Sequence, residues 1–289
     1  MPREPQPVVP SRPLQPKEND ADVSRARPPS VAVLLMSRLR WSHTPWALQR
    51  LARGPSAWPS VRGLRFAQVL GSGWRGGFGL WPGFNYQGVF ATFDEEEAAR
   101  EFAANSSVAV AYRDRSLEHF SAVLACTSSR GSWAGHTMTA HGSQAGKATP
   151  PPQDDHPIAA LTRASIRPRR ASQFWRHAPA THRALAQAVG CRVAVGLGEA
   201  PVLRQATFSL WESAQKMHAY ARQGAHQQAI EAAWGEGLFS ESMFVRFRPL
   251  CLQGTWAGVS LATGAVGRAG VAVDQDQRGE ALLNRLPHG

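Results

Sequence analysis

Two histidines in the C-terminal part of the chain have a spacing that bears on metal or haem binding. His218 and His226 fall in a segment, residues 212–234, whose pattern predicts a long helix. Eight positions place them two turns apart and roughly 80° apart around the helix axis, so a single small metal ion would need a ligand from elsewhere. A haem iron needs one axial nitrogen in an apolar cleft. Either histidine could also be an ordinary polar residue of the surface or core.

A cluster of arginines precedes these histidines. Its members are Arg163, Arg167, Arg169, Arg170, Arg176 and Arg183. Guanidinium groups form bidentate pairs with carboxylates and phosphates, which makes Arg163 and Arg167 candidates for pairing with haem propionates. Docking of an acidic electron donor and binding of nucleic acid are two further functional interpretations. A solvated basic face is the structural alternative.

A glycine-rich stretch, residues 71–76, matches the pattern G-x-G-x-x-G after a predicted strand. A dinucleotide site also needs a helix that starts there and presents its amide groups to the pyrophosphate. The following residues, Gly-Phe-Gly-Leu-Trp-Pro-Gly, cannot form a regular helix. We therefore expect an aromatic loop over residues 74–84 that could cover an apolar pocket. The sequence contains no G-x-S-x-G, H-E-x-x-H or P-loop motif, so these classes of hydrolase receive no support.

The composition is that of a globular and strongly basic protein. Hydrophobic residues make up 43% of the 289 residues, charged residues 18%, and the formal net charge is +11. Such a charge attracts nucleic acid, anionic lipid or an acidic protein without choosing among them. Three scattered cysteines predict neither disulfides nor a zinc site. With no apolar segment of membrane-spanning length and no signal core, we expect a cytoplasmic protein, in contact with the inner membrane at most peripherally.

Short motifs recur in the same order in two parts of the chain. Gly-Ser-Trp-Ala-Gly at 131–135 returns as Gly-Thr-Trp-Ala-Gly at 254–258, and Ala-Thr-Phe at 91–93 returns at 206–208. We expect two similar halves, residues 31–136 and 158–258, with a tail at 1–30, a linker at 137–157 and a second tail at 259–289.

The order of predicted elements is the same in both halves. The first has strands at 31–40, 65–70, 88–93 and 120–127, and helices at 45–53 and 94–105 with Asp94 as N-cap. The second has strands at 158–167, 192–197, 202–210 and 243–251, and helices at 172–189 and 212–234. This pattern predicts an α+β fold in which two ferredoxin-like β-α-β-β-α-β halves pack as a dimeric α+β barrel within one chain.

Several segments together resemble the spheroidene monooxygenases of carotenoid biosynthesis. They are Pro157–Pro168, Gly198–Pro201, Gln205–Ser209 with Trp211, Gly224–His226, Ala229-Ile230, Arg246-Phe247 and Gly254–Trp256. The resemblance implies O2-dependent oxidation of an acyclic carotenoid to hydroxy and keto products, with electrons from reduced ferredoxin. It also implies a haem protein, with His226 as the axial ligand.

Two features accompany this resemblance. His226 is followed by Gln227, where relatives often carry paired histidines. A carotenoid substrate resides in the bilayer, so a peripheral protein with an arginine-rich surface in contact with anionic lipid is expected. The alternatives are a haem-binding or small-substrate monooxygenase of the same barrel fold, a basic nucleic-acid-binding protein, and a duplicated barrel without activity.

Overall fold

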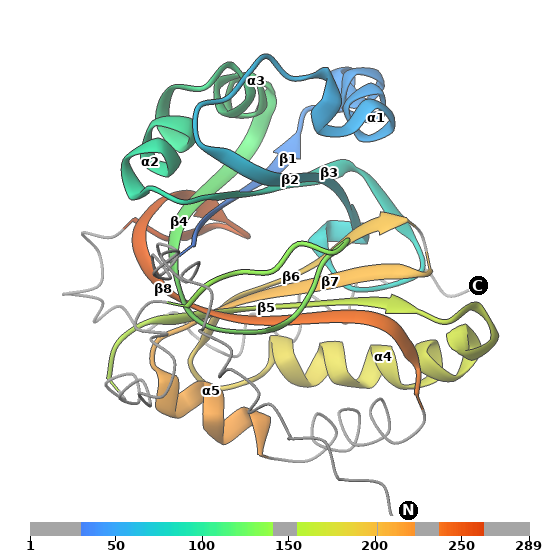
Figure 1. Ribbon diagram of the computed structural model, residues 1–289. Helices are drawn as coiled ribbons and strands as arrows, with labels where there is room; N and C mark the ends of the chain where they lie inside the picture. The colour runs from blue at the N-terminus through green and yellow to red at the C-terminus, as the bar shows by residue number, and fades with distance from the viewer. Residues whose placement is uncertain (1–29, 141–154, 201, 223–236, 263–289) are drawn as a thin grey trace, which may run out of the picture.

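Eight antiparallel strands form one closed barrel in the computed structural model, which describes residues 30–140, 155–200, 202–222 and 237–262 (Figure 1). The strand order is β4-β1-β3-β2-β6-β7-β5-β8, and the pairing of β8 with β4 closes the circle. The closed barrel that the sequence predicted is confirmed. No helix in the described part of the chain is long and apolar enough to cross a membrane.

The barrel contains an N-terminal half, β1–β4, and a C-terminal half, β5–β8. The first comprises β1 (Val31–Leu39), η1 (Trp41–His43), α1 (Thr44–Arg53), η2 (Gly54–Ala57), β2 (Leu64–Gly73), η3 (Trp74–Gly76), β3 (Pro82–Phe93), α2 (Glu96–Asn105), α3 (Ser107–Arg115) and β4 (Ser116–Gly131). The second comprises β5 (Ile158–Ile166), η4 (Pro168–Arg170), α4 (Ala171–Ala186), β6 (Cys191–Ala200), β7 (Arg204–Trp211), α5 (Ala214–Ala221) and β8 (Phe239–Trp256), followed by the short β9 (Val259–Ser260).

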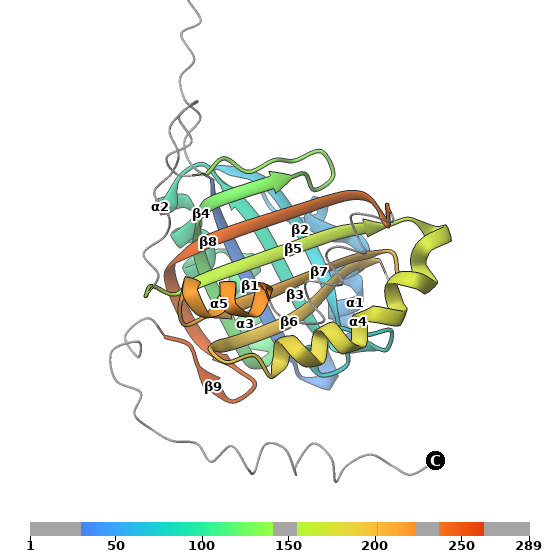
Figure 2. The same cartoon turned by 90° about the horizontal axis from the view of Figure 1, so that it is seen from below.

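Alternation along the strands divides the apolar residues between the inside and the outside of the barrel. One buried cluster draws side chains from all eight strands and fills the interior. A second lies between the N-terminal strands and α1, α2 and α3, and a smaller third lies between the C-terminal strands, α4 and α5. Figure 1 shows the two groups of helices on opposite sides of the barrel, and Figure 2 looks onto the side that carries α4 and α5.

The repeated Gly-x-Trp-Ala-Gly motif forms the same turn twice. Ala134 and Gly135 have φ of 49° and 77°, and Ala257 and Gly258 have φ of 52° and 77°. Two central residues with positive φ define a type I′ hairpin turn. Trp133 and Trp256 precede these turns at opposite ends of the β4–β8 ladder, and both side chains are buried in the barrel interior. The sequence repeat therefore closes each end of the ladder with a tryptophan.

The first glycine of each motif has a steric role. Gly254 has φ of 92°, and a Cβ there would lie 2.0 Å from the carbonyl oxygen of His119. Gly131 has φ of 83°, and its Cβ would lie 2.0 Å from the carbonyl oxygen of Ser242. The backbones of β4 and β8 thus approach too closely at both ends for any side chain.

We expect Gly254→Ala to lower the free energy of unfolding by about 3 kcal/mol, because strain at positive φ adds to a clash with backbone. Gly258→Ala is the matched control, since φ is 77° but nothing lies within 4 Å of its Cβ position. It should cost only about 1–2 kcal/mol. Urea denaturation measures the free energy of unfolding of both variants. Equal decreases would show that the close backbone approach at Gly254 adds nothing to the cost of the substitution.

Several elements differ from the sequence-based expectation. The predicted N-cap Asp94 is wrong, because α2 begins at Glu96 with Glu95 at the N-cap and Asp94 pairs with Arg65. Helix α3 was not predicted; its N-cap Ser106 accepts a hydrogen bond from the Ala109 amide. Strands β3, β4 and β8 are longer than predicted, since their ladders continue beyond the apolar runs.

The predicted helix 212–234 is described only as α5, and residues 223–236 lie outside the described part of the chain. The glycine-rich stretch 71–76 begins within β2 and ends in η3, and it starts no α-helix. Cys126, Cys191 and Cys251 are free thiols.

Candidate functional site

The outer faces of the two halves differ in side-chain size at matched positions. In the N-terminal half, Leu35 pairs with Val89, which pairs with Val69. The same row in the C-terminal half consists of Thr162, Thr207 and Gly196. The next row repeats the contrast at its first position, where Val33 is matched by Ala160. We call Ala160, Thr162, Ala194, Gly196, Thr207 and Ser209 the small-residue face.

Burial follows this contrast in size. Leu35 and Val89 are 1% and 0% exposed because they pack in the cluster beneath the helices of the N-terminal half. Thr162 and Thr207 are only half-buried. Where one half fills the space between sheet and helices with aliphatic side chains of its strands, the described strands of the other half present short side chains and two hydroxyl groups. The small-residue face is therefore suited to hold a group that is not part of the chain.

An aromatic loop from the N-terminal half reaches this face. The backbone of Gly77 and Phe78 lies so close to Gly196 that a Cβ there would be 2.5 Å from the Gly77 carbonyl oxygen. The ring of Phe78 stacks on Trp175 of α4 at 5.3 Å and meets Phe174 edge-on at 6.1 Å. Phe174 also contacts Phe239. The loop thus forms an aromatic wall at one edge of the small-residue face.

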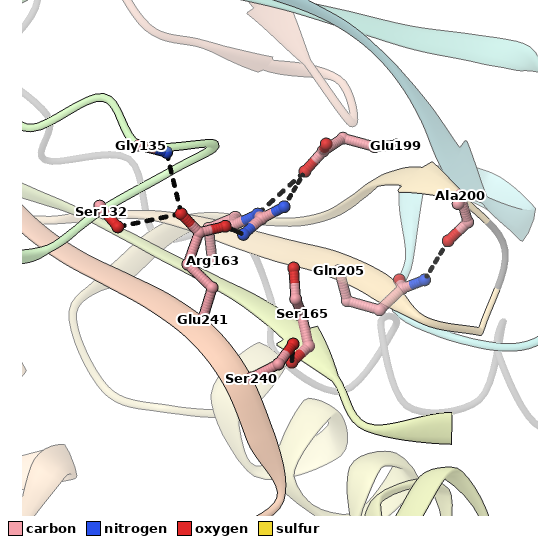
Figure 3. A network of polar contacts seen from close by, with 9 residues as sticks. All are labelled: Ser132, Gly135, Arg163, Ser165, Glu199, Ala200, Gln205, Ser240 and Glu241. Carbon is pink, nitrogen blue, oxygen red and sulfur yellow. Dashed lines mark hydrogen bonds and ion pairs between the residues drawn. The ribbon is translucent and has the colours of Figure 1, made fainter. Parts of the chain in front are cut away.

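A buried charged cluster lies inside the barrel on the other face of the same strands (Figure 3). Arg163 is 2% exposed, and its guanidinium pairs with Glu199 at 2.9 Å and with Glu241 at 2.5 Å. It also lies over the ring of Trp133, 5.6 Å from the centroid. The register of β6 against β7 shifts at Glu199, which has no partner opposite it on β7 and forms a β-bulge. A bulge changes the direction in which a side chain points.

Glu241 is held ionised in this cluster. Burial would raise its pKa, but hydrogen bonds from the Gly135 amide, the Ser132 hydroxyl, the Ala134 amide and Arg163 outweigh it and lower the pKa to about 2. Two carboxylates around one guanidinium leave the cluster with a formal charge of −1. Among the residues that the structure describes, the buried indole Nε1 of Trp133 has no hydrogen-bond partner.

The opposite end of the β4–β8 ladder carries the second copy of the turn motif, and a comparison of the two ends shows which residues of the cluster occur at both. Glu118 accepts a hydrogen bond from the Gly258 amide at 2.7 Å, as Glu241 does from Gly135. The position matched to Arg163 is Met36: Arg163 pairs with Met243 opposite Gly131, and Met36 pairs with Phe120 opposite Gly254. A carboxylate at the turn is therefore common to both ends, whereas the buried arginine is particular to one.

The lowered pKa of Glu241 links stability to pH. Its folded-state pKa of about 2 lies below the ordinary value of 4.5. This carboxylate therefore contributes stability fully above pH 4.5, and the contribution is lost as pH falls toward 2. We expect Glu241→Gln to flatten the decline in urea midpoint over this range. An unchanged slope would show that Glu241 is not held ionised by its partners.

The structure places the predicted site residues apart from one another. Arg163 faces the barrel interior, bound by two carboxylates, whereas Arg167 is exposed just beyond the end of β5. His218 lies in the last turn of α5, next to Met217, which shares a buried cluster with Ile158 at the opposite end of β5. Nine residues of extended chain span about 30 Å, so His218 and Arg167 do not share a site.

His226 lies outside the described residues. In the described part of the chain, no group of three or more His, Cys, Asp or Glu could hold a metal ion. Sequence reasoning missed Glu199, Glu241 and Trp133. An alignment of the two repeats would have matched Glu118 with Glu241. It would also have matched Arg163 with Met36 and so shown that the arginine occurs in one half alone.

Comparison with known proteins gives close relatives by sequence. A spheroidene monooxygenase from Rubrivivax gelatinosus is 46% identical over 228 residues, covering 79% of this chain and 85% of that protein. A spheroidene monooxygenase from Rhodobacter capsulatus is 33% identical over 218 residues, covering 75% of this chain and 88% of that protein. No family model matches the sequence.

Solved structures resemble this chain only distantly. A putative monooxygenase from Fusobacterium nucleatum is 7% identical, with a TM-score of 0.35, over 81% of this chain and 98% of that one. Such a likeness carries no argument about function, which rests on the sequence relatives. Since the first of these is 46% identical and is covered over most of its length, the chain belongs to the spheroidene monooxygenase family.

Proposed function

We propose that this protein is a monooxygenase that oxidises an acyclic carotenoid of the spheroidene type. The observation that carries the proposal is the 46% identity to a spheroidene monooxygenase over 79% of the chain. In each catalytic cycle one atom of O2 is inserted into a C–H bond of the carotenoid. The other atom leaves as water, with the uptake of two electrons and two protons. A second oxidation of the same carbon gives a geminal diol, which loses water to form the ketone.

Haem is the proposed cofactor, because side chains alone do not insert oxygen into a C–H bond. When bound, it supplies an iron at which O2 is reduced. What supports haem here is the small-residue face, which carries short side chains at the positions where the N-terminal half has Leu35, Val89 and Val69. Thr162 and Thr207 would lie against it, and His226 is the proposed axial ligand, with His218 as the second candidate.

The chain's own residues would bind the substrate, orient it and exclude water. Phe78 and Trp175 give an apolar wall suited to a polyene, which offers only apolar contacts along its length. Thr162 and Thr207 would lie beneath the cofactor and are not assigned a contact with the substrate. Arg163 would hold β5, β6 and β8 in register behind them through its two carboxylate partners.

Reduced ferredoxin is the proposed electron donor, and its acidic surface would need a basic docking site. Arg167, Arg169 and Arg170 are exposed after β5 and provide one; in this proposal Arg167 contacts the donor. Arg163 is unsuited to either the donor or a haem propionate, because its guanidinium is already engaged by Glu199 and Glu241. We further propose that the protein acts in the cytoplasm, in peripheral contact with the inner membrane.

We also propose that the barrel consists of two ferredoxin-like halves joined in one chain. The strand order β4-β1-β3-β2 in one half and β6-β7-β5-β8 in the other supports this, since each places its first and third strands together in the middle. The repeated type I′ turns with Trp133 and Trp256 support it as well.

Expression in a bacterium that accumulates spheroidene and lacks its own oxygenase tests the function. The expected result is conversion of the pigment to hydroxy and keto products when O2 is supplied. The haem proposal is tested separately by the visible spectrum of the purified protein, oxidised and then reduced under CO. We expect a haem band that shifts with CO, is altered by His226→Ala and is unaltered by His218→Ala. Unchanged pigment would refute the proposed function, and a colourless protein would refute the haem.

A further inference from the structure

The first strands and helix of the barrel lie in a stretch with an unusual charge pattern. Residues 31–93 contain seven arginines and no aspartate or glutamate. The whole chain has 21 acidic residues, so their absence from these 63 positions is a local feature rather than a general one. Carboxylates from outside the stretch lie beside two of these arginines, since Arg65 pairs with Asp94 and Arg38 lies opposite Glu118, and the stretch itself contributes only positive charge.

The same stretch supplies most of the exposed large apolar side chains. Among the described residues nine such side chains are exposed, and six of them come from residues 41–84. These six are Trp41, Leu48, Trp74, Leu80, Trp81 and Phe84, with Trp81 at 79% and Trp74 at 61%. A soluble protein rarely exposes several tryptophans together unless they contact a partner or a membrane.

The six side chains lie at one end of β1, β2 and β3. Arg38 pairs with Tyr86, and Asn85 donates a hydrogen bond to the Leu39 carbonyl oxygen, so η1 with Trp41 begins beside the start of β3. The Trp74 amide donates to the Trp81 carbonyl oxygen at 2.8 Å, which joins the two sides of the aromatic loop.

Helix α1 adjoins the same end of these strands. Gln87 donates a hydrogen bond to the Ala47 carbonyl oxygen, and Leu51 lies 3.6 Å from the Cβ position of Gly71. Leu48 is therefore close to the aromatic loop. Exposed Arg38, Arg40 and Arg75 lie among these apolar groups. We call the six apolar residues with Arg38, Arg40 and Arg75 the Trp–Arg surface.

We propose that the Trp–Arg surface docks on an anionic phospholipid bilayer. Tryptophan favours the interface between headgroups and acyl chains, and arginine favours anionic headgroups. The acidic groups of a protein partner would pair with the arginines but would not accommodate the apolar side chains of Trp74, Leu80 and Trp81. A bilayer accommodates both kinds of side chain, which is why we favour lipid over protein.

This surface is continuous with the candidate site. The aromatic loop exposes Trp74, Leu80 and Trp81 on its outer side, while Gly77 and Phe78 pack on Gly196 of the small-residue face. A bilayer-resident substrate would therefore leave the membrane beside the wall of the site. This last step rests on the proposed carotenoid oxidation, whereas docking itself does not.

Co-sedimentation with vesicles tests the docking. The full chain should bind vesicles of phosphatidylcholine with phosphatidylglycerol at least about ten-fold more tightly than vesicles of phosphatidylcholine alone. Arg38→Gln with Arg75→Gln should weaken binding about five-fold per arginine, and Trp74→Ser with Trp81→Ser about ten-fold or more. Val189→Ser is the control, since this exposed apolar residue precedes β6, away from the surface. Absence of vesicle binding, or equal binding by the tryptophan variant, would overturn the proposal.

Two substrate formats separate this inference from the proposed function. With carotenoid in detergent micelles, Trp74→Ser with Trp81→Ser should turn over at the wild-type rate; with carotenoid in vesicles it should be about ten-fold slower. Equal slowing in both formats would overturn the route from the membrane. No turnover by the wild type in either format would refute the function and leave the vesicle-binding result to decide docking alone.

Discussion

We expect the double variant Thr162→Leu with Thr207→Val, which fills the small-residue face, to lower carotenoid turnover by about 100-fold. The new residues are those that the N-terminal half carries at the matched positions, Leu35 and Val89, where they pack against helices. On the C-terminal half they would occupy the space proposed for the cofactor, and a displaced reacting group costs about this much in rate. The free energy of unfolding should not fall, because apolar area is added on a half-buried face.

Two controls make this result specific. Thr127→Leu makes the same chemical change on β4, away from the small-residue face, and should leave turnover unchanged. Leu35→Thr is the reciprocal exchange, and it should cost about 3 kcal/mol in unfolding free energy because that side chain is 1% exposed. Wild-type turnover in the double variant, with its stability intact, would rule out the small-residue face as the site.

Arg163→Met should destabilise the protein by about 3–5 kcal/mol. Methionine is the residue at the matched position of the other half, Met36, so its shape suits the barrel interior. The loss arises because the partly buried carboxylates of Glu199 and Glu241 would face each other without their common cation. Arg65→Met is the control: it breaks an exposed ion pair with Asp94 and should cost less than about 1 kcal/mol.

A triple variant separates structure from function in this cluster. Arg163→Met with Glu199→Gln and Glu241→Gln removes all three charges and should return most of the lost stability. We expect its turnover to stay at least about ten-fold below wild type, with kcat reduced more than KM, because the three strands behind the small-residue face lose their charged link. If the triple variant has the kcat of the wild type, the role of the charged cluster is structural only.

The sequence predicted the barrel well because its signals were local and repeated. The Gly-x-Trp-Ala-Gly motifs occur twice, and each dictates a turn through positive φ at Ala134 and Ala257. Helix α3 escaped prediction because its periodicity is weak and only the N-cap Ser106 marks it. Strand ends were misplaced where β4 and β8 continue by pairing with each other, a long-range effect that no local pattern carries.

The candidate site was harder to predict because it depends on which residues face each other across strands. Arg163 was chosen for its charge, but its partners Glu199 and Glu241 are distant in sequence and unremarkable alone. Thr162 and Thr207 carry no motif; they stand out only when the register pairs them and sets them against Leu35 and Val89. The choice of His226 as axial ligand stays a prediction.

The central claim is that this protein inserts oxygen from O2 into an acyclic carotenoid. The most direct test supplies the purified protein with spheroidene in micelles, a reduced ferredoxin and 18O2, and analyses the products by mass spectrometry. We expect a hydroxylated product that carries one 18O atom. Since a ketone exchanges its oxygen with water, the hydroxy product is the one to measure. A product whose oxygen comes from water, or no oxygenated product at all, would contradict carotenoid oxygenation by this protein.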